Sequence, residues 1–164
     1  MAQTDIQYSD DKATRYDEVI AEVLAVVAGE QNRTARFATA SCLLAHAFAP
    51  RFFWTGFYVV DPDKPNELVV GPYQGTLGCL RIPFGRGVCG AAAATLQTQL
   101  IDDVHAFPGH IACDSRSSSE IVVPVFDENN ALAAVLDVDS ETPAAFDAID
   151  KEKLETLCRE LLLD

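Results

Sequence analysis

Hydrophobic positions near the amino terminus repeat at the spacing of an α-helix. Residues 14–28 carry an apolar side chain every three or four positions, and Gly29 follows where a helix stop is expected. Residues 31–48 repeat the pattern up to Pro50, which cannot continue a helix. The pattern therefore predicts two amphipathic helices within about 14–48.

The middle of the chain changes to β-branched and aromatic runs separated by turn residues. Two strands joined by the turn-rich PDKPNE are predicted by the runs RFFWTGFYVVD and LVVGPYQG. A short strand, a glycine-rich turn, a short helix from near Val88 and another short strand at about 100–102 are expected to follow.

The last third predicts a hairpin and a closing helix. Strands at 120–126 and 131–139 flank the turn signal DENN, and a helix is expected at about 146–162. We therefore predict an α+β fold, a mainly antiparallel sheet of about six strands flanked by helices on one face. The sheet and its loops would occupy about 52–140 of a single domain, 1–164.

Charge and hydropathy narrow the possible partners. The chain has 25 acidic and 12 basic residues, a net charge of -13, and shows no basic cluster, which disfavours nucleic acid binding. No segment is long and apolar enough to span a bilayer, and the amino terminus lacks the basic head and apolar core of an export signal. A cytoplasmic location without membrane contact is expected.

Five cysteines are an odd number for a chain of this type, in which structural disulfides are rare. Cys42 and Cys158 fall within predicted helices, where small packing side chains are expected, buried in the case of Cys42. Cys79, Cys89 and Cys113 lie instead in turns and loops between sheet elements, where functional groups concentrate. These three are the candidates for chemistry.

The local surroundings of two of these thiols differ. Cys89 stands at the expected start of the short helix, close to Arg86, and both features favour a thiolate, although close packing between glycines explains the residue equally well. Cys113 lies in a polar loop, where it would be accessible. Asp114 beside it would raise its pKa, so its activation must come from elsewhere.

The same thiols could bind zinc together with two histidines. The possible ligands are Cys79, Cys89, Cys113, His105 and His110. Their spacing contains no C-x-x-C pair, so zinc is the weaker interpretation, and we predict neither a metal nor a cofactor.

Three carboxylates are expected to converge at one end of the sheet. The strand period of two places Asp137 and Asp139 on one face, and the hairpin would bring Glu120 opposite Asp139, near the loop of Cys113. Mutual repulsion among them can hold one carboxyl protonated near neutral pH.

An aromatic stripe precedes these groups in the chain. Trp54 and Tyr58 share a strand face with Phe52, which is typical of a core and would equally line an apolar pocket.

Taken together, these segments resemble the GAF-domain free methionine-(R)-sulfoxide reductases. The resemblance covers nearly the whole chain and is carried, in the order of that family, by WTGFY, GPYQG, GCLRIPFGRGVCG, DVHAFPGHIACDS, SEIVVPV and LDVDS. The fold features alone would indicate a GAF domain, a class that mostly serves as ligand-binding sensors. The three loop cysteines make the resemblance to the enzymes specific.

The resemblance implies a role for each loop cysteine. Cys113 corresponds to the catalytic cysteine, and Cys79 to the resolving cysteine that forms a disulfide with it. Cys89 corresponds to the third cysteine of the family, an alternative partner.

The resemblance also implies a substrate pocket. Glu120, Asp137 and Asp139 would bind the substrate ammonium and assist protonation of the sulfoxide oxygen. Trp54 and Tyr58 would form the wall around the methyl and sulfur end.

The expected function is thioredoxin-dependent reduction of free L-methionine (R)-S-oxide to L-methionine, through a cysteine sulfenic acid and an intramolecular disulfide. The alternatives are a GAF sensor that binds a small ligand without catalysis, and a thiol peroxidase or zinc-binding domain. The resemblance further suggests a homodimer paired through helices.

Overall fold

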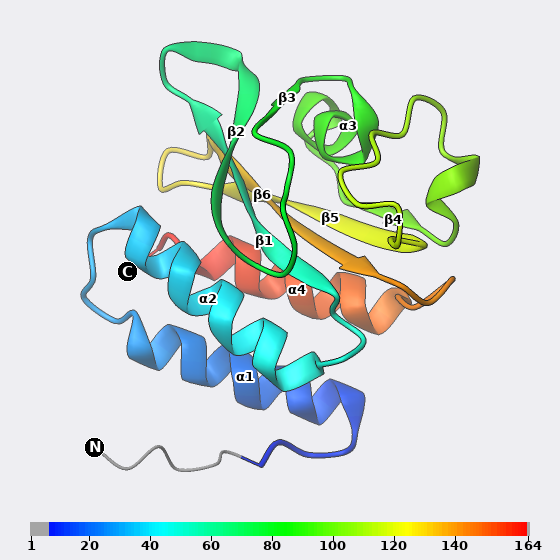
Figure 1. Ribbon diagram of the computed structural model, residues 1–164. Helices are drawn as coiled ribbons and strands as arrows, with labels where there is room; N and C mark the ends of the chain where they lie inside the picture. Colours follow the sequence, from blue (N-terminus) through cyan, green and yellow to red (C-terminus); the bar gives the residue numbers. More distant parts are fainter. Residues whose placement is uncertain (1–6, 164) are drawn as a thin grey trace.

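A six-stranded antiparallel sheet organises the structure, a computed structural model that describes residues 7–163 (Figure 1). The strand order is β3-β2-β1-β6-β5-β4, so β1 and β6 lie at the centre and β5 is the neighbour of β6. The strands are β1 (Trp54–Asp61), β2 (Lys64–Gln74), β3 (Arg81–Pro83), β4 (Gln99–Ile101), β5 (Ser119–Phe126) and β6 (Leu132–Ser140). The predicted α+β fold is confirmed.

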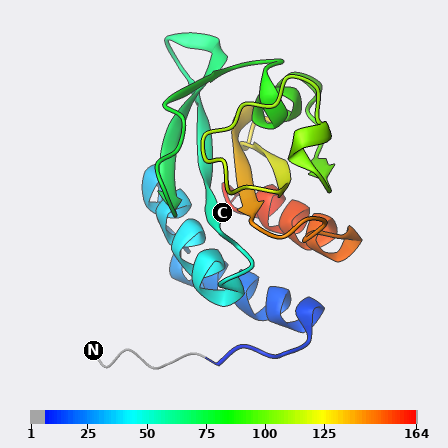
Figure 2. The ribbon, with the colours of Figure 1, turned by 45° about the vertical axis from the view of Figure 1, so that its right-hand side comes forward.

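Helices lie against both faces of this sheet (Figures 1 and 2). Three long helices pack on one face, as expected, and the short α3 packs on the other, with a 3-10 turn in the loop that follows β4. None of the described helices has both the length and the apolar character that crossing a membrane requires. The helices are α1 (Lys12–Val26), α2 (Arg33–Phe48), α3 (Gly87–Thr95) and α4 (Ala148–Glu160), and the 3-10 turn is η1 (Val104–Ala106).

The alternation of side chains along the strands separates two hydrophobic clusters. In β6, Leu136 and Val138 join the cluster under α1, α2 and α4, whereas Val135 joins the cluster under α3. Asp137 therefore points to the α3 side, as the period of two predicted. The functional groups carried by β5 and β6 gather on the face that the long helices leave open.

A buried carboxylate ties the long helices to the start of the sheet. Asp150 of α4 accepts hydrogen bonds from Tyr16 of α1 and Lys12 Nζ, at 2.5 and 2.8 Å, and pairs with Arg51 at 3.0 Å. It also closes a capping box with Asp147 at the amino end of α4. The carboxylate is fully buried, and these several contacts offset the free-energy cost of removing it from water.

Two expectations about packing are wrong. Cys42 is exposed, since it lies on the outward face of α2, whereas Cys158 is buried in the helix-side core as a packing residue. Phe52 precedes β1 and stacks on Phe48, with Phe146 nearby, on the side of the long helices. The alternation that governs β1 does not extend back to Phe52, so this ring does not continue the predicted aromatic stripe.

Candidate active site

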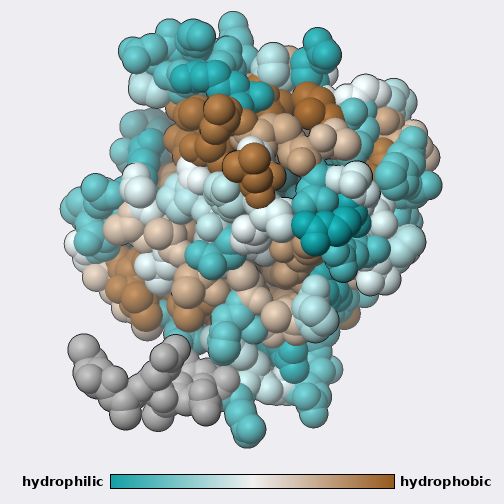
Figure 3. All heavy atoms as spheres, viewed as in Figure 1, coloured by the Kyte–Doolittle hydropathy of each residue, from teal (hydrophilic) through white to brown (hydrophobic). Residues whose placement is uncertain are grey.

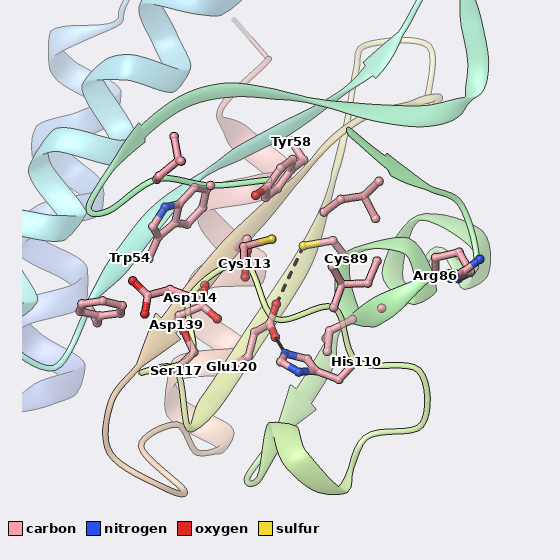
Figure 4. Close-up of a pocket in the computed structure, with 18 residues that line it drawn as sticks. Trp54, Tyr58, Arg86, Cys89, His110, Cys113, Asp114, Ser117, Glu120 and Asp139 are labelled. Carbon is pink, nitrogen blue, oxygen red and sulfur yellow. Dashed lines mark hydrogen bonds and ion pairs between the residues drawn. The ribbon is translucent and has the colours of Figure 1, made fainter. Parts of the chain in front are cut away.

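A pocket of about 520 Å³, its open mouth included, lies on the α3 side of the sheet (Figure 4). Its walls come from the ends of β1, β5 and β6, from the amino end of α3 and from the loops before β3 and β5. Every site residue predicted from the sequence lines the pocket, except Cys79, whose bonded partner does. These lining residues are Trp54, Tyr58, Cys89, Cys113, Glu120, Asp137 and Asp139.

A disulfide joins two loops at the mouth of the pocket. Cys79, in the loop between β2 and β3, is bonded to Cys113, in the loop that leads into β5, with Cα atoms 5.4 Å apart. Cys113 is exposed and Cys79 is half-buried. This is the pairing that the resemblance implies, and it places an accessible disulfide at the mouth of the pocket.

Strand register brings the three carboxylates together beneath that disulfide. Glu120 of β5 pairs with Asp139 of β6, and Asp137 lies one pleat further along, opposite Gly56 of β1. Glu120 and Asp137 are each only 5% exposed. The Sγ of Cys89 lies 3.9 Å from Glu120 Oε1 and donates to it, and Asp137 Oδ1 has no hydrogen-bond partner among the described residues.

Burial makes these carboxyls weak acids. Desolvation, and then repulsion from the two aspartates, raises the pKa of Glu120 well above its usual value. Desolvation and the charge of Asp137 likewise raise the pKa of Asp139, and desolvation raises the pKa of Asp137 to about 6. The pocket therefore keeps protonated carboxyls at neutral pH, as the convergence of the three groups predicted.

The structure overturns the expected thiolate at Cys89. The residue begins α3 as predicted, but its side chain is buried, and burial together with Asp137 and Glu120 raises the pKa of its thiol. Arg86, the residue before α3, makes no side-chain cap on the helix. Desolvation among carboxyls outweighs the partial charge of a helix terminus, so Cys89 is a neutral hydrogen-bond donor.

The negative charge of Asp114, the residue beside Cys113, is paired with a cation. Asp114 accepts hydrogen bonds from Thr76 at 2.7 Å and from Arg116 Nη2 at 2.9 Å, and these contacts, above all that with Arg116, lower the pKa of its carboxyl. Arg116 also lies over the ring of Phe53, 4.8 Å from its centroid. The repulsion that Asp114 would exert on a Cys113 thiolate is therefore reduced by a cation two residues away, which the sequence analysis missed.

His110 lines the pocket at a position that the sequence did not indicate, where it was a candidate only as a zinc ligand. Its Nε2 lies 3.8 Å from Glu120 Oε2, on the opposite side of that carboxyl from Cys89 (Figure 4). Burial lowers the pKa of the imidazole, which favours the neutral ring. The only signal in the sequence was its place three residues before Cys113.

Stacked aromatic rings form the apolar wall of the pocket. The rings of Trp54 and Tyr58 lie 5.6 Å apart and nearly parallel, and Tyr73 also stacks on Trp54, with ring centroids 4.8 Å apart. The indole Nε1 donates to the carbonyl of Thr76 at 2.9 Å. Gly78 crosses over both pocket rings, where an added Cβ would lie 3.0 Å from each, so the loop that carries the disulfide can approach this wall closely.

Among the described residues, one group brings its possible metal ligands close together, within 4.8 Å: Cys89, Glu120 and Asp137. It shares only Cys89 with the zinc set considered from the sequence. Cys79 and Cys113 are joined to each other, and a disulfide sulfur does not provide the thiolate that zinc takes.

The raised pKa of Asp137 predicts how stability depends on pH. Because the folded-state value is about 6 and the ordinary value 3.8, the native state binds more protons than the unfolded state between those values. The free energy of unfolding should therefore fall as pH rises from about 4 to about 7, by on the order of 3 kcal/mol from this group. Urea unfolding of Asp137→Asn should show a shallower fall, also because Asp137 raises the pKa of both other carboxyls.

The control for this measurement is Asp63→Asn, on the exposed β1–β2 turn, which should keep the wild-type dependence. If the stability of Asp137→Asn depended on pH as steeply as that of the wild type, the assignment of this pH dependence to Asp137 would be contradicted.

The comparisons with known proteins agree with this geometry. The family described as GAF domain matches residues 44–161. The free methionine-R-sulfoxide reductase of Escherichia coli is 43% identical over 92% of this chain and 88% of its own length. That of Saccharomyces cerevisiae is also 43% identical, over 80% and 74%.

A solved structure with a bound substrate has the same fold. The free methionine-R-sulfoxide reductase from Neisseria meningitidis, in complex with its substrate, matches with a TM-score of 0.89 and 47% identity, over 95% of this chain and 92% of that one. Because these matches extend over nearly all of the sheet, the helices and the pocket loops, the chain belongs to the free methionine-R-sulfoxide reductase family of GAF-domain proteins.

Proposed function

We propose that this protein reduces free methionine (R)-S-oxide to methionine and is regenerated by thioredoxin. One observation carries the proposal: the accessible Cys79–Cys113 disulfide lies at the mouth of a pocket whose floor holds buried, protonated carboxyls. Reduction of a sulfoxide needs these two kinds of group, a thiolate to attack sulfur and an acid to protonate oxygen. The relatives named above carry this activity in their names.

The reaction begins with the reduced enzyme. The Cys113 thiolate attacks the sulfoxide sulfur while a pocket carboxyl, Glu120 in our assignment, gives a proton to the oxygen. The oxygen passes to Cys113 as a sulfenic acid, and methionine leaves as the thioether. The Cys79 thiol then displaces water from the sulfenic acid and forms the disulfide that the structure contains. Cys89, a buried neutral thiol, would serve as a hydrogen-bond donor to Glu120.

Regeneration needs two electrons and two protons from outside the protein. Exchange with the dithiol of thioredoxin returns Cys79 and Cys113 to thiols and leaves thioredoxin as a disulfide. A reducing compartment supports such a cycle, and we propose the cytoplasm as its location.

The walls of the pocket suit a free amino acid. The substrate ammonium would lie against the carboxyl groups of Asp137 and Asp139, where its positive charge favours their ionised form, and its methyl and sulfur end would lie against Trp54 and Tyr58. Its carboxylate would lie at the amino end of α3, where Arg86 supplies no side-chain cap and the first residues of the helix, Gly87 and Val88, line the pocket. A pocket that receives both charged ends would exclude methionine within a peptide.

A sensor that only binds a ligand would not require a disulfide at the mouth of its pocket. We therefore favour the enzyme. Pairing into a homodimer through helices stays a prediction.

The proposal is tested by following NADPH oxidation in the presence of thioredoxin and thioredoxin reductase. The free R-sulfoxide should be consumed, whereas the free S-sulfoxide and N-acetylmethionine R-sulfoxide should not. The S-sulfoxide misplaces the sulfoxide oxygen, and the acetylated compound lacks the ammonium that the pocket must hold. Absence of NADPH oxidation with the free R-sulfoxide would refute the activity, and equal turnover of the acetylated compound would refute recognition of the substrate ammonium.

A further inference from the structure

Two leucines stand out in the loop between β2 and β3. Leu77 is 79% exposed and Leu80 is 72% exposed, the highest values among the exposed large hydrophobic residues of the described chain. Leu80 is held in a fixed place, since its carbonyl accepts a hydrogen bond from Val70 at 2.9 Å. Figure 3 shows hydrophobic side chains gathered on this face, over β2, β3 and the loop between them. Burying such side chains against a partner is favourable.

These leucines flank one half of the redox disulfide. Cys79 lies between them in sequence, and its partner Cys113 is exposed. Other exposed large hydrophobic residues, such as Leu96 and Leu163, lie at the ends of α3 and α4, and no disulfide adjoins them. An apolar surface beside the disulfide therefore lies where a reductant must approach.

We propose that Leu77 and Leu80 form the docking surface for the protein dithiol that reduces the Cys79–Cys113 disulfide. This inference rests on the proposed function and adds where and how its reductant binds. Two exposed leucines match an apolar rim around the thiols of a partner protein. A small anionic thiol such as glutathione would gain little from them, and the net charge of -13 would repel it.

The thiol–disulfide exchange at this surface proceeds by two successive thiolate attacks. The first thiolate of the docked partner attacks one sulfur of the disulfide, which forms a mixed disulfide and releases the other cysteine as a thiolate. The second thiolate of the partner then attacks the mixed disulfide at the partner's first sulfur. This releases the second cysteine and leaves the partner oxidised, while two protons restore Cys79 and Cys113 as thiols.

Leu80 provides the test, because it does not line the substrate pocket, whereas Leu77 does. The Leu80→Ser variant is assayed with free methionine (R)-S-oxide, once with thioredoxin and its reductase and once with dithiothreitol. We expect the KM for thioredoxin to rise roughly tenfold, the effect of losing one buried leucine at an interface. Turnover with dithiothreitol should be unchanged, and Leu80→Glu should raise the KM further.

The matched control is Leu163→Ser, an exposed leucine away from the disulfide, which should behave as the wild type with both reductants.

Each other outcome overturns the docking surface. An unchanged KM for thioredoxin in both Leu80 variants would refute it while leaving the proposed function intact. A change in oligomeric mass on gel filtration of Leu80→Ser would assign the surface to contact between copies of this chain. If the wild type reduces the sulfoxide with neither reductant, the proposed function fails first, and the docking surface with it.

Discussion

Replacing Cys113 by serine is expected to abolish reduction of free methionine (R)-S-oxide, with kcat falling at least about a thousandfold. Serine keeps the size of the side chain, but its hydroxyl is not ionised near pH 7 and cannot become a sulfenic acid. Because Cys113 lies at the pocket mouth above the carboxyls, neither of the two other loop thiols is expected to replace it: Cys89 is buried as a neutral thiol, and Cys79 is half-buried and does not line the pocket. NADPH oxidation coupled to thioredoxin measures the loss.

Two further variants make this result specific. Cys42→Ser changes an exposed cysteine on α2 and should retain wild-type turnover. Cys79→Ser should form about one methionine per protein and then stop with thioredoxin, because the sulfenic acid at Cys113 loses its bonded partner. Substantial multiple turnover by Cys113→Ser would show that another thiol carries the chemistry.

Replacing Glu120 by glutamine is expected to lower kcat by roughly a hundredfold to ten-thousandfold, the usual contribution of a positioned general acid. Glutamine keeps the shape and can still accept the hydrogen bond from Cys89, but it has no acidic proton to give. The effect should appear in kcat more than in KM, because Asp137 and Asp139 remain to hold the ammonium. In the wild type, kcat should decline as pH rises through the raised pKa of this carboxyl, and the variant should lose that decline.

The variant should also be more stable than the wild type at pH values above the usual range of a carboxyl pKa. The raised pKa of Glu120 means that ionisation opposes folding, so an uncharged replacement removes a cost. Glu128→Gln, on the exposed DENN turn, is the matched control and should change neither property. A Glu120→Gln enzyme with normal kcat would transfer the role of acid to one of the aspartates.

The arrangement of the carboxyls could be predicted because it depends on local rules. Side chains alternate along β6, and the DENN turn sets the register of β5, so Asp137 and Asp139 had to share a face and Glu120 had to face Asp139. The chemistry of the three loop cysteines could be assigned only through resemblance, since spacing alone does not show which loops meet.

The parts that could not be predicted depend on burial. The start of α3 was recognised, but whether Cys89 pointed to water or into the carboxyl cluster is decided by how α3 packs on β5 and β6, which reverses the direction of its pKa shift. The hydrogen bond from Thr76 to Asp114 likewise needs the fold, because Thr76 is 38 residues away. Cys42 was misplaced because the helical pattern of 31–48 contains apolar residues on its outward side as well.

The disulfide at the pocket mouth also affects how the protein survives the conditions that create its substrate. Oxidants that convert methionine to its sulfoxide also convert thiolates, step by step, into sulfinic and sulfonic acids that thioredoxin does not restore. While Cys113 is bonded to Cys79, it has no free thiolate to enter that series. When reductant is scarce, the exposed sulfur of Cys113 is held in a form that one exchange can recover, so a shortage of reducing equivalents pauses the enzyme without destroying it.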